Sequence, residues 1–208
     1  MPLLRQVSLH EVKDADIREH YRRTFGDRDP VAEPGTASGT PGDWWTTFAL
    51  SPSVLRNSAD FLLMAADPES KLSLSPRHRE LGVLRQAWVN GCKFIFSQHC
   101  KSARMFAGIS DEEIAAIPNW QVSPLFTPVE RALLTLTDAI TSEHGRVEPK
   151  VVEVLQDGLP DEAILEFSYI VSLYMAHGTM IRALRLEYDN VDDPIVEVPA
   201  PDPDKPFG

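Results

Sequence analysis

The side chains best suited to chemistry lie close together in one stretch, GCKFIFSQHCKSARMFAG (91–108). It contains both cysteines of the chain, Cys92 and Cys100, and one of its six histidines, His99. A thiolate is a strong nucleophile and an imidazole transfers protons near neutral pH, so these groups suit redox or acid–base chemistry. The same residues also suit the buried side of a helix, because free cysteine is among the most often buried residue types.

A helical arrangement of this stretch puts Cys92 and His99 on one face. At about 100° per residue, the inward stripe consists of Cys92, Ile95, Phe96, His99, Ala103 and Phe106, and the opposite side consists of Lys93, Ser97, Lys101 and Arg104. Cys100 is expected at the edge of the stripe. Cys92 and His99 are about 10 Å apart along the helix axis, so they line one face without touching. Cys92 and Cys100 are too far apart for a disulfide within an intact helix.

The helix expected before this stretch adds a carboxylate, Glu80. Its inward face holds Leu81, Leu84, Ala87 and Trp88, with Glu80 at the edge of that face. A carboxylate in this position must be hydrogen-bonded or have a raised pKa. Gly91 predicts a tight turn, so that the two helices pack side by side and Glu80 faces Cys92 and His99. A carboxylate, a thiol and an imidazole in a half-apolar crevice form a group suited to proton transfer.

Helix signals occupy almost all of the chain between its ends. Capping boxes predict helix starts at Ser8, Ser110 and Thr127, and Ser75 followed by Pro76 predicts another. The expected helices cover residues 8–25, 51–67, 75–90, 92–107, 128–143, 148–156 and 160–187, with short helices after Asp43 and Ser110. No segment shows sustained period-two alternation, so the fold class is expected to be all-α.

The chain is expected to have three parts. Residues 1–49 hold an N-terminal helix, a long Gly- and Pro-rich loop (26–43) and a Trp-bearing segment. A loop of this length is typical of a mobile or functional segment such as a lid. Residues 50–187 form the helical domain, and residues 188–208 form an acidic, Pro-rich tail that is extended or disordered.

Composition and charge exclude several partners. The net charge of −11 disfavours nucleic acid and anionic membrane surfaces, which both require a basic face. The N-terminus does not resemble a signal peptide, no run approaches about 18 apolar residues, and two cysteines are too few for a disulfide framework. There is no Cys-x-x-Cys, no His-x-x-x-His and no glycine-rich phosphate loop after a strand. We therefore expect a cytoplasmic protein without metal, cofactor, nucleic-acid or membrane partner.

The segment RHRELGVLRQAWVNGCKFIFSQHCKSARMFAGISDEEIAAI (77–117) resembles the core motif of the carboxymuconolactone decarboxylase and AhpD-like alkylhydroperoxidase superfamily. The AhpD-like pattern has a glutamate, the first cysteine of a Cys-x-x-Cys pair twelve residues later, and a histidine four residues after the second cysteine. Glu80, Cys92 and His99 occupy these three places. The resemblance covers roughly residues 50–187. It implies an AhpD-like helical bundle, a small-molecule substrate, no cofactor and a homo-oligomer.

One position departs from the family pattern. The second cysteine of the pair falls at Ile95, which can neither attack a peroxide nor carry a proton. The usual dithiol relay is therefore not available. Cys100 is adjacent to His99 but points elsewhere on the helix, so it is not a simple substitute.

The resemblance also implies roles for residues around the crevice. It places the C-terminal helix against the site, so His177 is expected as a second proton carrier or as a packing residue beside Gly178. The residues expected to contact the substrate are His177, Tyr174, Ile95, Phe96 and Arg85. Two roles stay open for Arg85, a structural ion pair and a clamp for a substrate carboxylate.

Three functions are compatible with these residues. The first is a cofactor-free, carboxymuconolactone decarboxylase-like enzyme that decarboxylates, isomerises or cleaves a small organic carboxylate or carbonyl compound. In it, His99 is the general acid or base, Glu80 its partner, and Cys92 a wall or minor participant. The second is a thiol-dependent peroxidase in which Cys92 becomes a sulfenic acid that an external thiol resolves. The third is a non-catalytic helical oligomer with a vestigial site, which a pair between Glu80 and Arg85 would favour.

Overall fold

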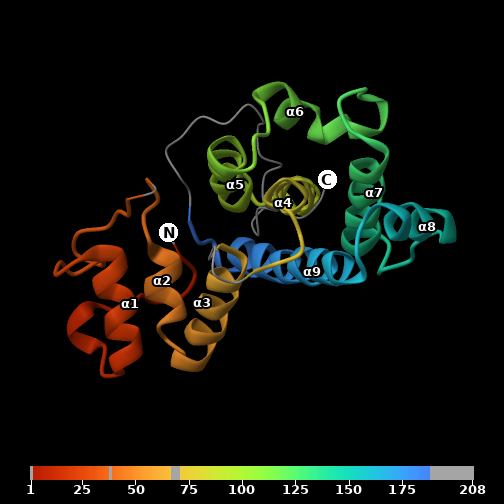
Figure 1. The fold of residues 1–208 in the computed structure, drawn as a ribbon. Helices are drawn as coiled ribbons and strands as arrows, with labels where there is room; N and C mark the ends of the chain where they lie inside the picture. Colours follow the sequence, from red (N-terminus) through yellow and green to blue (C-terminus); the bar gives the residue numbers. More distant parts are fainter. Residues whose placement is uncertain (1, 38, 67–70, 188–208) are drawn as a thin grey trace, which may run out of the picture. The chain divides into compact units, whose positions relative to one another are not determined.

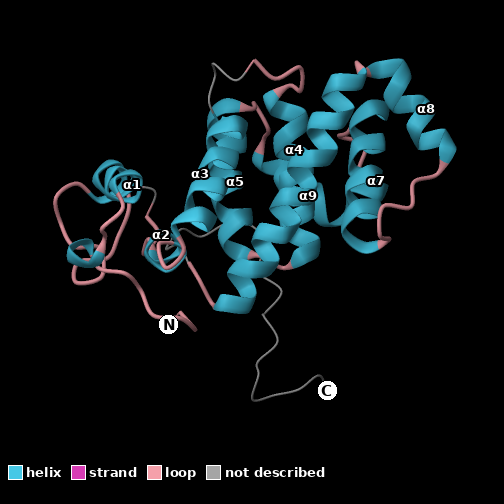
Figure 2. Cartoon of the chain, turned by 90° about the horizontal axis from the view of Figure 1, so that it is seen from below, coloured by secondary structure: helices cyan, strands magenta, loops and turns pink. Residues whose placement is uncertain are grey.

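The computed structural model describes residues 2–37, 39–66 and 71–187. This part of the chain contains helices, turns and loops but no strand, which confirms the all-α fold class (Figure 1, Figure 2). Its α-helices are α1 (Ala15–Phe25), α2 (Asp43–Phe48), α3 (Pro52–Ala66), α4 (Pro76–Asn90), α5 (Lys93–Phe106), α6 (Asp111–Ala116), α7 (Pro128–Ser142), α8 (Pro149–Gly158) and α9 (Asp161–Leu184), with 3-10 helices η1 (Leu9–Glu11) and η3 (Ile117–Val122). The tail expected to be extended or disordered, 188–208, lies outside the described residues.

Side-chain caps explain where several of these helices begin. The Ser75 hydroxyl accepts a hydrogen bond from the His78 N–H at the start of α4. Complete capping boxes form at Ser110 before α6 and at Thr127 before α7. Three of the four predicted starts are therefore confirmed, and each cap satisfies backbone donors that the first helical turn leaves unpaired.

The fourth predicted start, at Ser8, does not begin the expected long helix. The box at Ser8 forms, but it caps only the single turn η1. Val12 then adopts an extended conformation, and α1 begins only after Asp14, whose carboxylate accepts from the Asp16 and Ile17 N–H groups. A single helix was expected over 8–25. The chain instead forms a short turn and then α1, which begins after its own cap at Asp14.

Contacts group the described chain into two compact units. The first comprises the residues up to 71 together with those from 181 to the end of the described chain, and the second comprises residues 72–180. The division into 1–49, 50–187 and 188–208 was based on composition and resemblance, and it stays a prediction.

Aromatic side chains form much of the core of the first unit. Tyr21 and Phe25 of α1 meet edge to face, and Trp44 stacks on Phe48 in α2, with all four buried. The Tyr21 hydroxyl donates a hydrogen bond of 2.8 Å to the Val7 carbonyl. This bond satisfies the polar end of a buried ring and ties the N-terminal segment to α1.

Glu187 joins the end of the described chain to the start of α2. Its Oε1 accepts from the Trp44 N–H at 2.8 Å, and its Oε2 accepts from the Gly42 N–H at 3.2 Å. In return, the Glu187 N–H donates to Asp43 Oδ1 at 2.8 Å. Burial is the main cause that raises the pKa of Glu187 to about 7, and the negative charge of Asp43 acts in the same direction. The carboxylate thus caps α2 from a distant part of the sequence.

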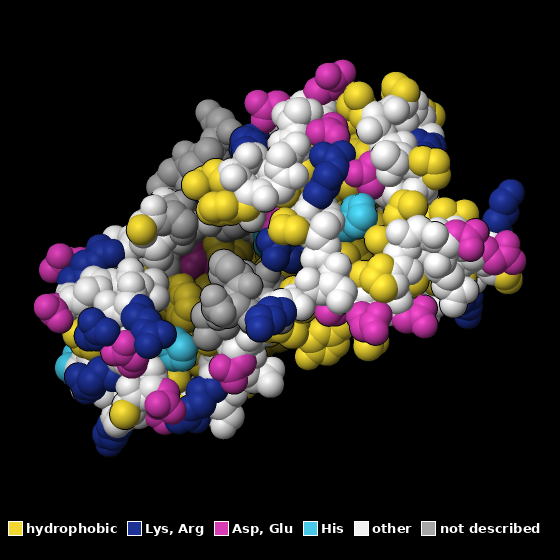
Figure 3. All heavy atoms as spheres, in the orientation of Figure 1, with side chains coloured by type: hydrophobic (Ala, Val, Ile, Leu, Met, Phe, Trp, Pro, Cys, Tyr) yellow, Lys and Arg dark blue, Asp and Glu magenta, His cyan; other side chains and the backbone are white. Residues whose placement is uncertain are grey.

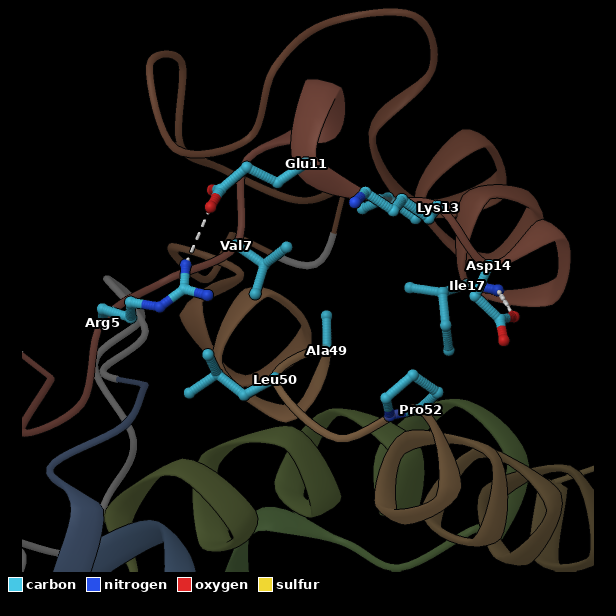
Figure 4. Close-up of a pocket in the computed structure, with 10 residues that line it drawn as sticks. Arg5, Val7, Glu11, Lys13, Asp14, Ile17, Ala49, Leu50 and Pro52 are labelled. Carbon is cyan, nitrogen blue, oxygen red and sulfur yellow. Dashed lines mark hydrogen bonds and ion pairs between the residues drawn. The ribbon is translucent and has the colours of Figure 1, made fainter.

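A cavity of about 490 Å³ also lies in the first unit (Figure 4). Its apolar lining comes from Val7, Val12, Ile17, Ala49, Leu50 and Pro52, and its charged lining from Arg5, Glu11, Lys13 and Asp14. Glu11 pairs with Arg5 at 2.9 Å, and Asp14 pairs with Arg56. Both carboxylates therefore have structural partners, and none of the expected site residues lines this cavity.

In the second unit, α4 packs against α5, α7 and η3. Gly82 allows α9 to approach α4 closely, since a Cβ built on it would lie 2.5 Å from the buried ring of Phe167. Arg77, in the first turn of α4, donates to Glu113 of α6 and to Glu130 of α7. These contacts fix α4, which carries part of the candidate site.

One described helix, α9, is long and apolar enough to cross a membrane by length and composition alone. Its best 18-residue window has a mean hydropathy of 1.2, and 33% of that window is buried inside the protein. The expectation that no segment approaches a membrane span is therefore too strict for α9. A core helix of a globular protein meets the same criteria, and α9 packs against α4 through Phe167 and Val171.

Charged side chains of both signs are interspersed on the face drawn in Figure 3. Basic residues do not gather there into the continuous patch that nucleic-acid binding requires. The expectation that the protein binds neither nucleic acid nor membranes stays a prediction.

Candidate active site

Two consecutive helices and the turn between them position the candidate site. α4 ends at Gly91, whose φ of 64° lies in the left-handed region that glycine adopts without strain. The turn is tight enough for the Cys92 N–H to donate to the Ala87 carbonyl at 2.9 Å, and α5 begins at the next residue. α4 and α5 therefore pack side by side, as the sequence indicated.

Glu80 of α4 and His99 of α5 are in direct contact. His99 Nδ1 lies 2.6 Å from Glu80 Oε2, and the Glu80 side chain is only 1% exposed. An ionised carboxylate can only accept a hydrogen bond, so Nδ1 carries the proton between them and the lone pair of a neutral His99 lies on Nε2. In the described part of the chain, no hydrogen-bond partner contacts Nε2.

The second oxygen of Glu80 is held from two further sides. Ser102 Oγ and Arg79 Nε each donate to Oε1 at 3.1 Å. Burial opposes ionisation of Glu80, but the charges and hydrogen bonds of His99 and Arg79 outweigh it, so the pKa of Glu80 lies below its usual value. The sequence predicted that Glu80 would either be hydrogen-bonded or have a raised pKa. The structure shows the hydrogen bonds, and the pKa of Glu80 is lowered.

Tyr174 of α9 packs against the imidazole. The ring centroids of His99 and Tyr174 are 4.8 Å apart, with an angle of 87° between the planes. Burial raises the pKa of Tyr174, and the negative charge of Glu80 acts in the same direction. The Tyr174 hydroxyl therefore stays protonated, and its ring restricts the orientation of His99.

Cys92 and Ile95 form a tightly packed wall beside α9. Both are buried, and a Cβ built on Gly178 would lie 3.3 Å from Cys92 Cβ and 3.1 Å from Ile95 Cδ1. Cys92 is also the N-cap residue of α5, a position whose partial positive charge favours a thiolate. Burial in apolar surroundings has the opposite effect on a thiol.

His177 lies on α9 and Phe96 on α5, the helices that also carry Tyr174 and His99. His177, adjacent to Gly178, is half-buried, and burial lowers its pKa to about 4, so it is neutral near pH 7. Phe96 is buried and meets Trp88 of α4 edge to face at 6.0 Å. The roles expected for these two residues toward a substrate stay predictions.

Arg85 is engaged within the protein. Its Nε and one terminal nitrogen donate to the two carboxylate oxygens of Asp138 in α7 at 2.6 and 3.1 Å. The other terminal nitrogen donates to the carbonyls of Ile117 and Pro118. The sequence left two roles open for Arg85, a structural ion pair and a clamp for a substrate carboxylate. These contacts favour the structural ion pair. They also mean that Arg85 does not form the pair with Glu80 that would have favoured a vestigial site.

The helical wheel of α5 differed from the structure at three positions. Ser97, expected on the outer side, is completely buried, and so is Cys100, expected at the edge. Phe106, expected to face inward, is 68% exposed. The buried arc of α5 is therefore broader than one-sided packing predicts, and it does not extend to Phe106, the last residue of the helix.

Sequence reasoning missed Ser102 and Arg79 as partners of Glu80. Ser102 lies three residues after His99, and this spacing puts two side chains next to each other on a helix. Arg79 directly precedes Glu80, so sequence adjacency was a weaker signal. No group of three or more His, Cys, Asp or Glu side chains suited to a metal occurs within the described ranges.

Comparisons with known proteins point to one family. Residues 58–139 match the model of the carboxymuconolactone decarboxylase family, and this range includes Glu80, Cys92 and His99. An uncharacterized protein YdfG of Bacillus subtilis (strain 168) is 26% identical over 101 residues, which cover 48% of this chain and 68% of the relative.

Two solved structures share the fold. A protein of unknown function from Agrobacterium tumefaciens, whose name suggests an AhpD antioxidant defence protein, is 26% identical with a TM-score of 0.61, covering 69% of this chain and 94% of that one. A peroxidase-related protein of Ralstonia eutropha JMP134, described as an alkylhydroperoxidase AhpD core, is 18% identical with a TM-score of 0.66, covering 91% and 92%. These likenesses show that the chain has the all-helical AhpD-like fold, and that its residues 58–139 match the carboxymuconolactone decarboxylase family model.

Proposed function

We propose that this protein is a cofactor-independent enzyme that transfers protons on a small organic carboxylate or carbonyl compound, in a decarboxylation, isomerisation or lyase reaction. The observation that carries the proposal is the 2.6 Å contact between His99 Nδ1 and Glu80 Oε2, with Nε2 lacking a hydrogen-bond partner in the described part of the chain. An imidazole oriented by a buried carboxylate is a common arrangement for general acid–base catalysis.

The chemistry follows from the charges in the site. Neutral His99 accepts a proton at Nε2 from an acidic C–H or O–H group of the substrate, which leaves an enolate or another anion. The resulting imidazolium is stabilised by ionised Glu80, and it returns the proton to a different atom of the substrate or to the leaving group. If the substrate instead loses carbon dioxide, His99 first takes a proton from solvent at Nε2, and the resulting imidazolium protonates the carbanion that remains. In each case His99 and Glu80 return to their starting states.

A thiol-dependent peroxidase is the second candidate. The position of Cys92 at the N-terminus of α5 favours this function, as do relatives whose names include peroxidase or AhpD. The Cys92 thiolate would attack a hydroperoxide, which breaks the O–O bond and releases an alcohol, leaving a sulfenic acid. Because Ile95 cannot supply a second thiol, two external thiols would reduce the sulfenic acid to the thiol and become a disulfide, with release of water.

One set of variants separates the two candidates. We would incubate the wild-type protein with a panel of small carboxylates, carboxylated lactones and carbonyl compounds in D₂O, and follow deuterium incorporation and product formation by NMR. Separately, peroxide consumption would be measured with several thiol reductants. His99→Gln should lower turnover by about 10²-fold or more, since general acid–base catalysis contributes this much, whereas Cys92→Ser should retain most of it. The exposed histidine variant His10→Gln serves as the control.

The outcomes are distinct. Full activity of His99→Gln on a substrate that the wild-type protein converts would contradict the proton-transfer proposal. Peroxide consumption that disappears in Cys92→Ser, together with a sulfenic acid on Cys92 detected by mass spectrometry, would establish the peroxidase instead. No turnover in either assay would favour the non-catalytic alternative.

The expected homo-oligomer and cytoplasmic location stay predictions. In the second unit, α9 exposes the large apolar side chains Leu165, Tyr169 and Met180. Their spacing puts them on one side of the helix, so they form a surface on which a second copy of the chain can pack.

A further inference from the structure

We propose that Ser102 and Arg79 are positioning residues that hold Glu80 so that His99 keeps its proton on Nδ1 and presents its lone pair at Nε2. This inference rests on the proposed proton-transfer function, which requires a basic nitrogen directed at the substrate. It goes further, because it names the groups that select the tautomer of the imidazole.

The arrangement of donors around Glu80 supports this role. Oε2 faces His99 Nδ1 at 2.6 Å, while Oε1 accepts from both Ser102 Oγ and Arg79 Nε at 3.1 Å. The carboxylate is almost completely buried, so solvent is a poor source of replacement donors for Oε1. With its far oxygen held on two sides, the carboxylate is hindered from rotating away from the imidazole.

The positions of both donors follow from helix geometry. Ser102 lies three residues after His99 on α5, so the helix that carries the imidazole also carries a donor for the carboxylate. Arg79 approaches from α4, the helix of Glu80 itself. The imidazole is therefore aligned by a carboxylate that both helices fix, and the Tyr174 ring at 4.8 Å limits its rotation from the side of α9.

The position of Glu80 determines which ring nitrogen of His99 carries the proton. A free imidazole favours the form with its proton on Nε2, which would remove the lone pair from the open side of the ring. A fixed carboxylate at Nδ1 reverses this preference, since it accepts only from a protonated Nδ1. Loss of either donor should loosen Glu80 and raise the fraction of His99 with its proton on Nε2.

The test is nitrogen-15 NMR of the histidine side chains at a pH where His99 is neutral, with His99→Gln used to assign its signals. Ser102→Ala should raise the ratio of the Nε2–H to the Nδ1–H tautomer by roughly fivefold, which corresponds to a hydrogen bond of typical net strength. Arg79→Gln should change the ratio in the same direction. Ser102→Thr keeps the hydroxyl and should restore the wild-type ratio.

The matched control is Ser97→Ala. It removes a buried hydroxyl of the same helix that forms no hydrogen bond with any described residue. It should leave the ratio unchanged, and circular dichroism should show that each variant is folded. An unchanged ratio in folded Ser102→Ala would overturn the proposal, as would an equal change in Ser97→Ala. The measurement needs no substrate, so a failure of the proposed enzymatic function gives a separate result in the turnover assay.

Discussion

Among single residues, Arg85 illustrates how partners decide the role of a charge. Its guanidinium makes a two-point contact with Asp138 and also donates to two backbone carbonyls. Arg85→Met should lower the free energy of unfolding by about 2–4 kcal/mol, because it removes the cation paired with a largely buried carboxylate and the donor of two carbonyls. Asp138 would keep only the neutral donors of Trp120 and Gln121. Urea denaturation of the purified protein measures this effect.

An exposed pair provides the comparison for Arg85. Arg22 contacts Glu19 on the surface of α1, and Arg22→Met should leave the stability nearly unchanged, because solvent screens an exposed ion pair. If Arg85→Met were as stable as the wild-type protein but had a raised KM, Arg85 would be a substrate clamp instead.

Residue types and spacing were sufficient to predict that Glu80 faces His99, because the turn at Gly91 makes α4 and α5 neighbours. They were not sufficient for Arg85, whose partner lies 53 residues away on another helix. Residue types and spacing also could not predict which donors would bind each of the two carboxylate oxygens of Glu80. That division depends on side-chain positions that only the folded packing fixes.

Among the helices, the crossing of α4 and α9 depends on Gly82. An added Cβ would lie 2.5 and 2.6 Å from two ring carbons of Phe167 and 3.0 Å from Val171. Gly82→Ala should therefore destabilise the protein by about 1–3 kcal/mol through overpacking, although alanine favours a helix by about 1 kcal/mol relative to glycine. Thermal unfolding followed by circular dichroism checks this expectation.

The matched change for Gly82 is Ser172→Ala, at an exposed position of α9. It should shift the unfolding temperature little, since a surface substitution away from special features is nearly neutral. A Gly82→Ala protein more stable than the wild-type would show that the α4–α9 contact relaxes readily around the new methyl group.

Local signals predicted most helix boundaries, because caps act within one turn. Ser75, Ser110 and Thr127 each determine a helix start through their own side chains. Ser8 shows the limit of such signals, since its capping box forms and yet the backbone leaves the helical conformation at Val12. A cap satisfies the first donors of a helix but cannot ensure that the helix continues.

For the whole molecule, the buried carboxylate of Glu187 predicts a dependence of stability on pH. Its pKa is about 7 in the folded protein against an ordinary value of 4.5, so the folded state binds more protons than the unfolded state between these values. Stability should therefore fall as the pH rises from about 4.5 to about 7, by about 3 kcal/mol for a shift of this size. Glu187→Gln should flatten this part of the profile.

The measurement is urea denaturation of both proteins at several pH values between 4.5 and 8. His99→Gln is a useful control, because it changes a side chain in the second unit and leaves Glu187 in place. Identical pH profiles for Glu187→Gln and the wild-type protein would show that Glu187 is not the group responsible.

The contact between Glu187 and the N–H groups of Gly42 and Trp44 also has a consequence for the order of events during synthesis. The first unit consists of the earliest residues of the chain together with residues after 180, and Leu3 donates to the Leu184 carbonyl at 2.8 Å. A ribosome therefore releases the first part of this unit long before the segment that completes it. The second unit, made from a continuous stretch, can fold as soon as that stretch has emerged, whereas α2 lacks its cap until Glu187 has emerged.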